Sequence, residues 1–387
     1  MPTEIKNTST LCPMPFNSIS YSMVGEIGPC TNCSLTNYSS IPKYWNSKEV
    51  IQLRTDMING IRNPACNECY SREDVGAWNT RQSLMEHVTD LDWVKVQDPI
   101  VEQLWFRFSN LCNYMCIDCN GYTSSSIFKE DIERGLHIKT PIVVYPGNDP
   151  NLALNEAKEH VRSLKVIAFS GGEPLLHWQM YDMLNYMIEH DVKPTLGYYT
   201  NLSKLDNKGQ SLTELWNHFD TVSAHVGFDA MGDGCDYFRK NMSFDGTIEN
   251  INRVLKESPH VDITIVVTFT WVNAINAVEM IHWFNKNYPN QKITMNFVIH
   301  DELNMQRAPE FKKNQIDSAL KTLLEIRNPQ FNVDMAQSVI NYLWAEDQSD
   351  KFPDSLVWIK DLDAWRKQDF RIAFPEHQDI NYEDYLK

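Results

Sequence analysis

Residues 104–119 read LWFRFSNLCNYMCIDC, and this stretch decides the fold. Its first six residues are mostly large and apolar, which is typical of a buried strand. Directly after them, Cys112, Cys116 and Cys119 fall within eight residues. The sequence therefore predicts a strand that runs into a loop of closely spaced cysteines.

The Cys-x3-Cys-x2-Cys spacing of this loop points to an iron–sulfur cluster with one open iron. A [4Fe-4S] cube has four irons, so three thiolates hold three of them and leave the fourth without a protein ligand. An open metal position can bind a further molecule, as it does in catalytic zinc sites. Taken alone, the cysteines are also compatible with a zinc site or with buried thiols, although zinc loops favour two separated Cys-x2-Cys pairs.

Strands and helices alternate in the sequence from residue 104 onward. The predicted strands cover residues 104–109, 164–169, 193–199, 221–228, 262–269 and 293–299. The predicted helices between them include residues 177–190, 212–218, 244–257 and 274–287. Such alternation predicts an α/β fold with a parallel sheet and right-handed crossovers, closed or partly closed into a barrel. The chemistry of such folds lies at the carboxyl ends of the strands, where the cysteine loop and Gly171-Gly-Glu-Pro174 both fall.

Three segments with different patterns predict the domain organisation. Residues 1–100 are rich in cysteine and show little periodicity apart from a predicted helix at 74–87, which indicates a small unit held by metal. Residues 101–300 hold the alternating strands and helices, and residues 301–387 carry helical periods. We therefore expect a metal-binding unit, a barrel and a helical C-terminal cap.

Composition and charge argue against several classes of function. Hydrophobic residues make up 42% of the chain, which is too many for a disordered protein. The 51 acidic and 35 basic side chains give a formal charge of −16, so duplex nucleic acid is disfavoured as a partner. The sequence shows neither a basic start with an apolar core nor an apolar run of bilayer length, so we expect a cytoplasmic protein that binds no membrane. In that reducing compartment, cysteines are expected to be metal ligands or redox groups.

Together, these landmarks resemble those of radical SAM enzymes over residues 101–300. The resemblance implies a partial (β/α)6 barrel and a [4Fe-4S] cluster on Cys112, Cys116 and Cys119. In that family, the amino and carboxylate groups of S-adenosylmethionine (SAM) chelate the fourth iron, and one electron cleaves the sulfonium to give a 5′-deoxyadenosyl radical. The radical abstracts hydrogen from a substrate, and the electron comes from a low-potential donor such as flavodoxin or ferredoxin.

The resemblance also assigns the residues that contact SAM, which are Gly171, Gly172, Glu173, Pro174, Asn201, Asp229 and Arg239. Gly171–Pro174 looks like the Gly-Gly-Glu motif that takes the methionyl amino group, and glycine suits a backbone that must approach a ligand closely. Arg239 would meet the SAM carboxylate, because guanidinium and carboxylate pair through two hydrogen bonds. Two residues depart from the family pattern: Asp118 stands where an aromatic residue is common, and Gly227 replaces the usual serine.

The amino-terminal cysteines resemble the twitch half of a SPASM domain, which binds one auxiliary [4Fe-4S] cluster. The pattern is Cys12, then Gly25 and Cys30, and later Cys66-Asn-Glu-Cys69. By this resemblance, Cys12, Cys30, Cys66 and Cys69 would be the four ligands. The family usually places this unit after the barrel, whereas here it comes before.

Cys33 opens an alternative in the same segment. The pairs Cys30-Thr-Asn-Cys33 and Cys66-Asn-Glu-Cys69 have the spacing of a structural zinc site. Zinc on these two pairs leaves Cys12 without a role, so the iron–sulfur interpretation explains more of the pattern. Both interpretations stay open at the level of the sequence.

The predicted function is hydrogen abstraction from a peptide or protein side chain, since the resemblance to twitch and SPASM enzymes implies such substrates. Within the same chemistry, the alternative substrate is a small molecule such as a sugar, a nucleoside or an aminoglycoside. A function of another class is a zinc-stabilised binding module on a barrel that no longer cleaves SAM. Cys235 stands apart from the other cysteines and is expected to be an ordinary packed thiol.

Overall fold

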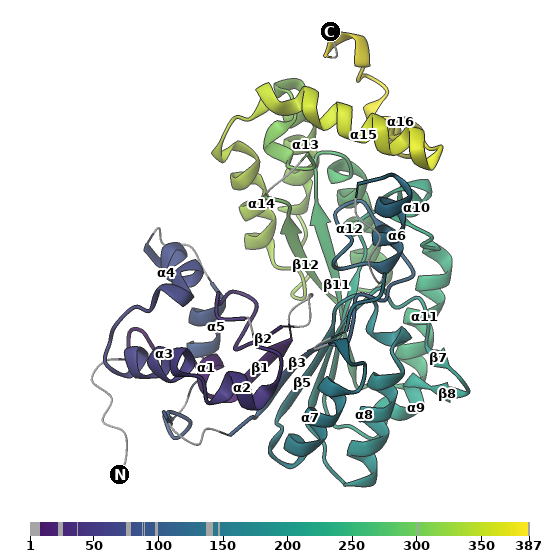
Figure 1. Ribbon diagram of the computed structural model, residues 1–387. Helices are drawn as coiled ribbons and strands as arrows, with labels where there is room; N and C mark the ends of the chain where they lie inside the picture. Colours follow the sequence, from purple (N-terminus) through teal and green to yellow (C-terminus); the bar gives the residue numbers. More distant parts are fainter. Residues whose placement is uncertain are drawn as a thin grey trace. The chain divides into compact units, whose positions relative to one another are not determined.

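A computed structural model (Figure 1) describes residues 8–21, 26–36, 38–74, 79–86, 88, 90–96, 100–136, 142–145, 148–299 and 302–385. The chain divides into two compact units. The first comprises residues 1–112, 121–199 and 206–222, and the second comprises residues 113–120, 200–205 and 223–387. The predicted metal-binding segment therefore shares the first unit with part of the predicted barrel. No helix among the described residues is both long enough and apolar enough to cross a lipid bilayer.

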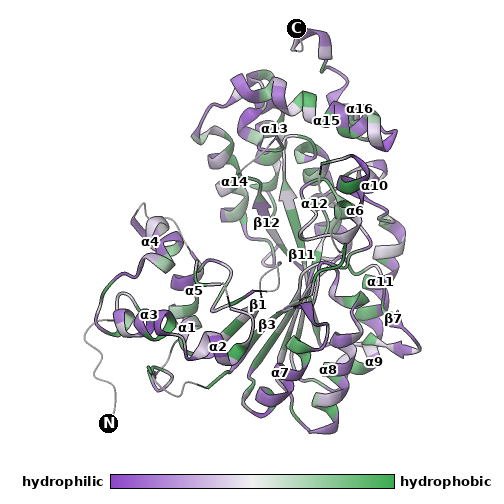
Figure 2. Cartoon of the chain, viewed as in Figure 1, coloured by the Kyte–Doolittle hydropathy of each residue, from purple (hydrophilic) through white to green (hydrophobic). Residues whose placement is uncertain are grey.

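Strands of the first unit lie in the order β6-β5-β3-β1-β2. Their bounds are β1 Ser18–Tyr21, β2 Ile27–Gly28, β3 Gln103–Arg107, β5 Val166–Ser170 and β6 Thr195–Thr200. Neighbours pair in parallel except β1 and β2, which pair antiparallel at the edge. Helices α6 Ser125–Glu133, α7 Leu152–His160, α8 Trp178–Glu189 and α9 Leu212–Trp216 accompany these strands. Figure 2 shows hydrophobic residues concentrated along the strands, whereas hydrophilic residues are frequent on the helices.

Aromatic rings stack along the buried face of this sheet. Phe106 on β3 stacks on Phe108 with ring centroids 4.8 Å apart, and Phe169 on β5 lies 5.0 Å from Tyr198 on β6. All of these rings are buried. Burial and close aromatic pairing both stabilise the packing of β3, β5 and β6. The cysteine loop and Gly171–Pro174 follow β3 and β5, so they extend from strands that are firmly packed.

Comparison with the sequence confirms the central strands and corrects the amino-terminal segment. The predicted strands 104–109, 164–169 and 193–199 correspond to β3, β5 and β6, with ends that differ by at most two residues. The edge strands β1 and β2 are not predicted, because strands of four and two residues are too short to show a period. The helix predicted at 74–87 is confirmed only over residues 80–86, which form α5 (Thr80–Glu86), and the preceding helix α4 (Asn67–Asp74) ends at Asp74.

Short helices surround the amino-terminal cysteines within the first unit. They are α1 (Met14–Asn17), α2 (Ile41–Trp45), α3 (Lys48–Ile58), α4 and α5. Serine side chains cap two of them, because Ser40 accepts a hydrogen bond from the Lys43 N–H at the start of α2, and Ser47 accepts one from the Val50 N–H at the start of α3. The capping serines explain why helices begin in a segment with little periodicity.

The second unit combines parallel strands with helices. Its strands lie in the order β12-β11-β9, and their bounds are β9 Val222–Gly227, β11 Val261–Phe269 and β12 Lys292–Phe297. A separate antiparallel pair joins β4 (Met115–Cys116) to β10 (Arg239–Lys240). The helices include α10 Asp233–Phe238, α11 Phe244–Glu257, α12 Ala274–Asn287, α13 Glu310–Leu323, α14 Val333–Ala345, α15 Phe352–Arg366 and α16 Phe370–Ala373. The helices predicted at 244–257 and 274–287 coincide with α11 and α12, and helices occupy the predicted C-terminal cap.

Candidate functional site

The Gly171–Pro174 loop lies against the backbone that leads into the cysteine loop. The Glu173 N–H donates to the Leu111 carbonyl at 2.8 Å. A Cβ placed on Gly172 would stand 2.2 Å from that carbonyl oxygen, and the φ of Gly172 is +52°. Only glycine satisfies both conditions, because it has no Cβ and adopts positive φ without strain. The motif is therefore held directly beside the residue that precedes Cys112.

Glycine is also needed at Gly171, the first position of this motif. Glu173 and Pro174, which end the motif, turn the chain. Gly171 has a φ of +78°, and a Cβ there would meet the Arg107 side chain at 2.8 Å. Glu173 is fully buried, and its carboxylate accepts a hydrogen bond from the Leu175 N–H at 3.0 Å. Pro174 begins a short 3-10 helix. Glu173 thus caps the turn that carries the chain away from the end of β5.

Serines at the start of α6 hold the backbone of Cys112. The Cys112 N–H donates to the Ser125 hydroxyl at 3.2 Å, and the Ser126 hydroxyl donates to the Cys112 carbonyl at 2.7 Å. Ser124 accepts a hydrogen bond from the Ile127 N–H and so caps the helix. These bonds fix the first cysteine of the loop to the helix that follows the loop.

The three loop cysteines differ in exposure. Cys112 is half-buried, Cys116 is buried and Cys119 is exposed, and the Cys119 N–H donates to the Cys116 carbonyl at 3.2 Å. The structure describes all nine cysteines, and none of them forms a disulfide. Among the described residues, no group of three or more His, Cys, Asp or Glu side chains could hold a metal ion. A [4Fe-4S] cluster needs a wider spacing of thiolates than a single metal ion does, because each thiolate binds a different iron of the cube.

Arg239 lies beside Cys116 and is held by a buried carboxylate. Its guanidinium Nε donates to Asp229 at 2.6 Å, and its Nη1 lies 3.9 Å from the Cys116 sulfur. Asp229 is fully buried, and its other oxygen accepts the Thr268 N–H at 2.7 Å. Burial lowers the pKa of Arg239, but the negative charges of Asp229, Cys116 and Asp118 outweigh burial and hold the pKa above its usual value. The guanidinium is therefore a fixed positive charge beside Cys116, which is a predicted cluster ligand.

The two departures from the family pattern both lie next to Arg239. A Cβ on Gly227 would stand 2.5 Å from the Arg239 Nη2, so a side chain at this position would displace the guanidinium from its place beside Asp229. Burial and the charge of Asp229 raise the pKa of Asp118 to about 6, against the opposing effect of Arg239. Asp118, the residue before Cys119, therefore interacts electrostatically with both Asp229 and Arg239.

Asn201 contacts the cysteine loop through a residue that the sequence does not single out. The Asn201 side chain donates to the Asn113 side-chain oxygen at 3.0 Å, and Asn113 donates to the Ser203 hydroxyl at 3.0 Å. Asn241 donates to the Asn113 backbone carbonyl at 3.2 Å. No pattern in the sequence marks Asn113, because its side-chain partners lie at least 88 residues away along the chain.

Five cysteines of the first unit gather in one group, which we call the N-terminal thiol group. Its members are Cys12, Cys30, Cys33, Cys66 and Cys69. A hydrogen bond from Cys66 lowers the pKa of Cys33, and the nearby Ser34 N–H donates to the Ala65 carbonyl at 3.0 Å. The structure therefore brings together the four predicted ligands of the auxiliary cluster and adds Cys33. Gly25, the remaining residue of the predicted pattern, lies outside the described residues.

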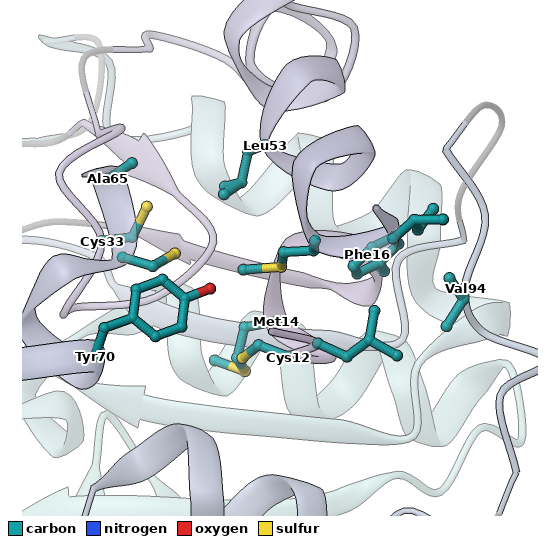
Figure 3. Close-up of a cluster of buried hydrophobic side chains, with 12 residues drawn as sticks. Cys12, Met14, Phe16, Cys33, Leu53, Ala65, Tyr70 and Val94 are labelled. Atoms are coloured by element: carbon teal, nitrogen blue, oxygen red, sulfur yellow. The ribbon is translucent and has the colours of Figure 1, made fainter. Parts of the chain in front are cut away.

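Apolar side chains enclose most of the N-terminal thiol group, as Figure 3 shows for Cys12 and Cys33. Met14, Phe16 and Leu53 are among the buried residues of the same cluster. Burial raises the pKa of Cys12 to about 12, although a hydrogen bond from the Met14 backbone opposes the shift. Thiols in such surroundings ionise readily only when a cation takes up the charge. Thiolates are suitable ligands for an iron–sulfur cluster or for zinc, but the described side chains of this group are not arranged to hold a single metal ion.

Cys235 is placed as a packing residue. It lies in α10 and is 2% exposed. Burial raises the pKa of its thiol to about 12, so the thiolate is disfavoured at neutral pH. This environment agrees with the expectation of an ordinary packed thiol.

Comparisons with known proteins identify the family. The model of the Radical SAM superfamily matches residues 106–306, which is more than half of the 387 residues. No curated protein matches the chain. Similar solved structures include native anSMEcpe with bound AdoMet (13% identity, TM-score 0.41, 58% of this chain and 60% of that chain covered). Another is Streptococcus suis SuiB bound to precursor peptide SuiA (12% identity, TM-score 0.39, 73% of this chain and 64% of that chain covered). A third is TYW1 with a lysine-pyruvate adduct bound (15% identity, TM-score 0.32, 58% of this chain and 71% of that chain covered). The chain thus spans about three fifths of the anSMEcpe structure, and the family match to residues 106–306 shows that it belongs to the radical SAM superfamily.

Proposed function

We propose that this radical SAM enzyme binds a [4Fe-4S] cluster through Cys112, Cys116 and Cys119 and abstracts hydrogen from a peptide or protein side chain. The observation that best supports the SAM site is the position of Gly172, whose missing side chain lets the Gly-Gly-Glu-Pro loop lie against Leu111. When bound, the cluster and SAM supply one-electron cleavage of the sulfonium and a 5′-deoxyadenosyl radical.

The residues of the chain would bind and orient SAM. The Gly171–Pro174 loop would receive the methionyl amino group, because its glycines let the backbone lie directly against Leu111, the residue before Cys112. Arg239 would receive the carboxylate, because Asp229 holds its guanidinium in place and keeps it charged. Asn201 would contribute a further polar contact from the end of β6, where Asn113 fixes its side chain.

We further propose that the N-terminal thiol group binds an auxiliary [4Fe-4S] cluster, with Cys12, Cys30, Cys66 and Cys69 as ligands. The support is that these four thiols come from distant parts of the sequence yet lie in one group, in which Cys12, Cys30 and Cys66 pack among apolar side chains. Cys33 belongs to the same group, so structural zinc on two Cys-x2-Cys pairs is the alternative. Electrons would come from a low-potential donor such as flavodoxin or ferredoxin.

The substrate class follows from the twitch-like pattern of the N-terminal cysteines, since enzymes with such a unit often modify peptides. The formal charge of −16 favours a neutral or basic peptide over an acidic one. A sugar, a nucleoside or an aminoglycoside is the alternative for the same radical chemistry. Fold alone does not determine the substrate, so the substrate class needs a direct test. The enzyme is incubated with deuterated candidate peptides, and transfer of deuterium into 5′-deoxyadenosine identifies a peptide as the substrate.

Anaerobic purification tests the cofactors. Two clusters predict brown protein with about eight irons and eight sulfides per chain. Added SAM should change the electron paramagnetic resonance (EPR) spectrum of the reduced enzyme, and dithionite with SAM should yield 5′-deoxyadenosine. Colourless protein that contains zinc and forms no 5′-deoxyadenosine would instead identify a binding module.

A further inference from the structure

One largely buried ion pair joins α5 to α4, the helix that carries Cys69 of the N-terminal thiol group. Arg81 on α5 donates to both carboxylate oxygens of Glu73 on α4, at 2.7 Å and 2.6 Å. Both side chains are only 11% exposed. Glu73 lies four residues after Cys69 in the same helix, one helical turn away. A paired carboxylate and guanidinium in this position hold α5 against the helix that carries Cys69.

The same guanidinium also reaches the segment that carries Cys12. Its third nitrogen, Nη1, donates to the Leu11 carbonyl at 2.8 Å. Leu11 directly precedes Cys12, so Arg81 connects the backbone at Cys12 with the helix that carries Cys69. The two cysteines are 57 residues apart in the sequence, and hence only tertiary contacts of this kind can set their separation.

Tyr70 supplies a second link between the same two segments. It follows Cys69 in α4, is 1% exposed, and its hydroxyl donates to the Thr10 carbonyl at 3.2 Å. The Arg81 guanidinium lies 5.7 Å from the centre of the Tyr70 ring. Both links therefore act on the same pair of thiols.

From these contacts we infer that Arg81 and Glu73 are positioning residues of the auxiliary centre, which hold Cys12 at ligand distance from the cluster bound by Cys69. The inference rests on the proposed function of the N-terminal thiol group. Metal ligands are commonly oriented by such surrounding hydrogen bonds, and loss of one typically weakens metal binding by about 10- to 100-fold. Removal of Arg81 would also leave Glu73 buried without its partner.

The test compares Arg81→Gln, Arg81→Lys and Glu73→Gln with the control Arg62→Gln, all in the anaerobic full-length protein. Arg62 pairs with Asp74 on the same helix and lies 5.1 Å from the same Tyr70 ring, but its side chain is 50% exposed. The measurements are iron per chain, the rate of iron release to bathophenanthroline, and the midpoint potential and EPR spectrum of each cluster. SAM binding to the other cluster reports whether the barrel remains intact.

We expect iron release from one cluster to become at least about tenfold faster in Arg81→Gln and Glu73→Gln, with a changed potential and EPR spectrum for that cluster alone. Arg81→Lys should fall between Arg81→Gln and wild type, because lysine keeps the charge but not the planar fork. If Arg81→Gln does not fold, Arg81→Lys carries the test. The control Arg62→Gln should match wild type.

Two results would overturn the inference, and they are distinguishable. Wild-type protein that holds only one cluster would remove the proposed auxiliary centre and the inference with it. Wild-type protein with two clusters, combined with unchanged iron release, potential and spectrum in Arg81→Lys and Glu73→Gln, would overturn the positioning role alone.

Discussion

The cysteine loop of residues 112–119 and the N-terminal thiol group are built in opposite ways. The loop places three cysteines within eight residues, and serines at the start of α6 hold its first cysteine. The N-terminal thiol group collects five cysteines from a stretch of 58 residues and buries four of them. Local spacing alone defines the first, whereas the second exists only because several segments fold against one another.

This difference shows that the two groups should respond differently to mutation. A loop whose geometry follows from its own backbone depends most on its ligands and on the residues that touch its backbone. A group assembled from distant segments depends as well on the contacts that hold the segments together. The following predictions test the contrast, from the largest expected effect to the smallest.

The largest effect is expected from removal of a ligand in each region. Cys116→Ala should reduce 5′-deoxyadenosine formation by at least about 100-fold, because the proposed SAM-binding cluster loses one of its three thiolates. Cys66→Ala should keep SAM cleavage but stop product formation, because it removes a ligand of the proposed auxiliary centre only. Quantitative chromatography of 5′-deoxyadenosine and product checks both variants. Equal loss of cleavage in the two would contradict the division of roles.

A methyl group on Gly172 should disturb the loop region alone. The Cβ would stand 2.2 Å from the Leu111 carbonyl, so the Gly171–Pro174 loop must move. A displacement near 1 Å costs about 100-fold in a catalytic geometry, and we expect a loss of that order in the rate of SAM cleavage for Gly172→Ala. Iron at the N-terminal thiol group should not change.

Gly209→Ala is the matched control for Gly172→Ala. Gly209 also has positive φ, +82°, but a Cβ there meets nothing within 4 Å. Its substitution should cost about 1 kcal/mol of stability, seen by calorimetry, and leave SAM cleavage unchanged. If Gly172→Ala and Gly209→Ala reduce the rate of SAM cleavage to the same extent, the loss is caused by backbone strain and not by contact with Leu111.

Arg239→Lys should weaken SAM binding by about tenfold, because lysine cannot pair with Asp229 and a carboxylate as the planar guanidinium does. Equilibrium dialysis of anaerobic protein with labelled SAM measures the change. Arg253→Lys is the control, since Arg253 forms only a partly exposed pair with Glu257. Unchanged SAM affinity in Arg239→Lys would remove Arg239 from the proposed site.

The last prediction concerns acid sensitivity, which we expect to be independent of both cysteine regions. Burial lowers the pKa of His377 to about 3, and the charge of Lys312 adds to the shift while Asp379 opposes it. Its Nε2 lies 2.7 Å from the Val272 carbonyl, so the neutral ring donates there. Unfolded histidine binds a proton below pH 6.5, so the unfolded state gains protons first and stability falls as pH decreases from 6.5 towards 3.

His377→Gln should therefore flatten the decrease in stability between pH 6.5 and 4, where each unit of pH contributes at most about 1.4 kcal/mol for one group. Thermal unfolding at several pH values measures the slope. His218→Gln, at an exposed position, is the control and should keep the wild-type slope. A wild-type slope in His377→Gln would assign acid sensitivity to other groups.

Much of the fold could be predicted because its pattern is local. The helices α11 and α12 match their predicted ranges, since apolar residues recur at helical spacing in residues 244–257 and 274–287. The strands β1 and β2 could not be predicted, because they are too short to show a period and gain their place by pairing. Tertiary pairing therefore decided the edge of the sheet.

The candidate site divides in the same way. Cys112, Gly171 and Glu173 are recognisable in the sequence, because each belongs to a motif of fixed spacing. Asn113 and Arg81 cannot be recognised in this way. Asn113 bonds to Asn201, 88 residues away, and Arg81 bonds to Leu11, 70 residues away. Hydrogen bonds between distant residues leave no periodic trace in the sequence.

The sequence by itself determined the class of chemistry and the alternation of strands and helices, because cysteine spacing and apolar periodicity act over a few residues. Only the tertiary structure decided that Cys33 lies beside Cys66, that Arg239 lies against Gly227, and that Arg81 bonds both to Glu73 and to the Leu11 carbonyl. Such contacts depend on how distant segments pack, and packing is a property of the folded chain as a whole.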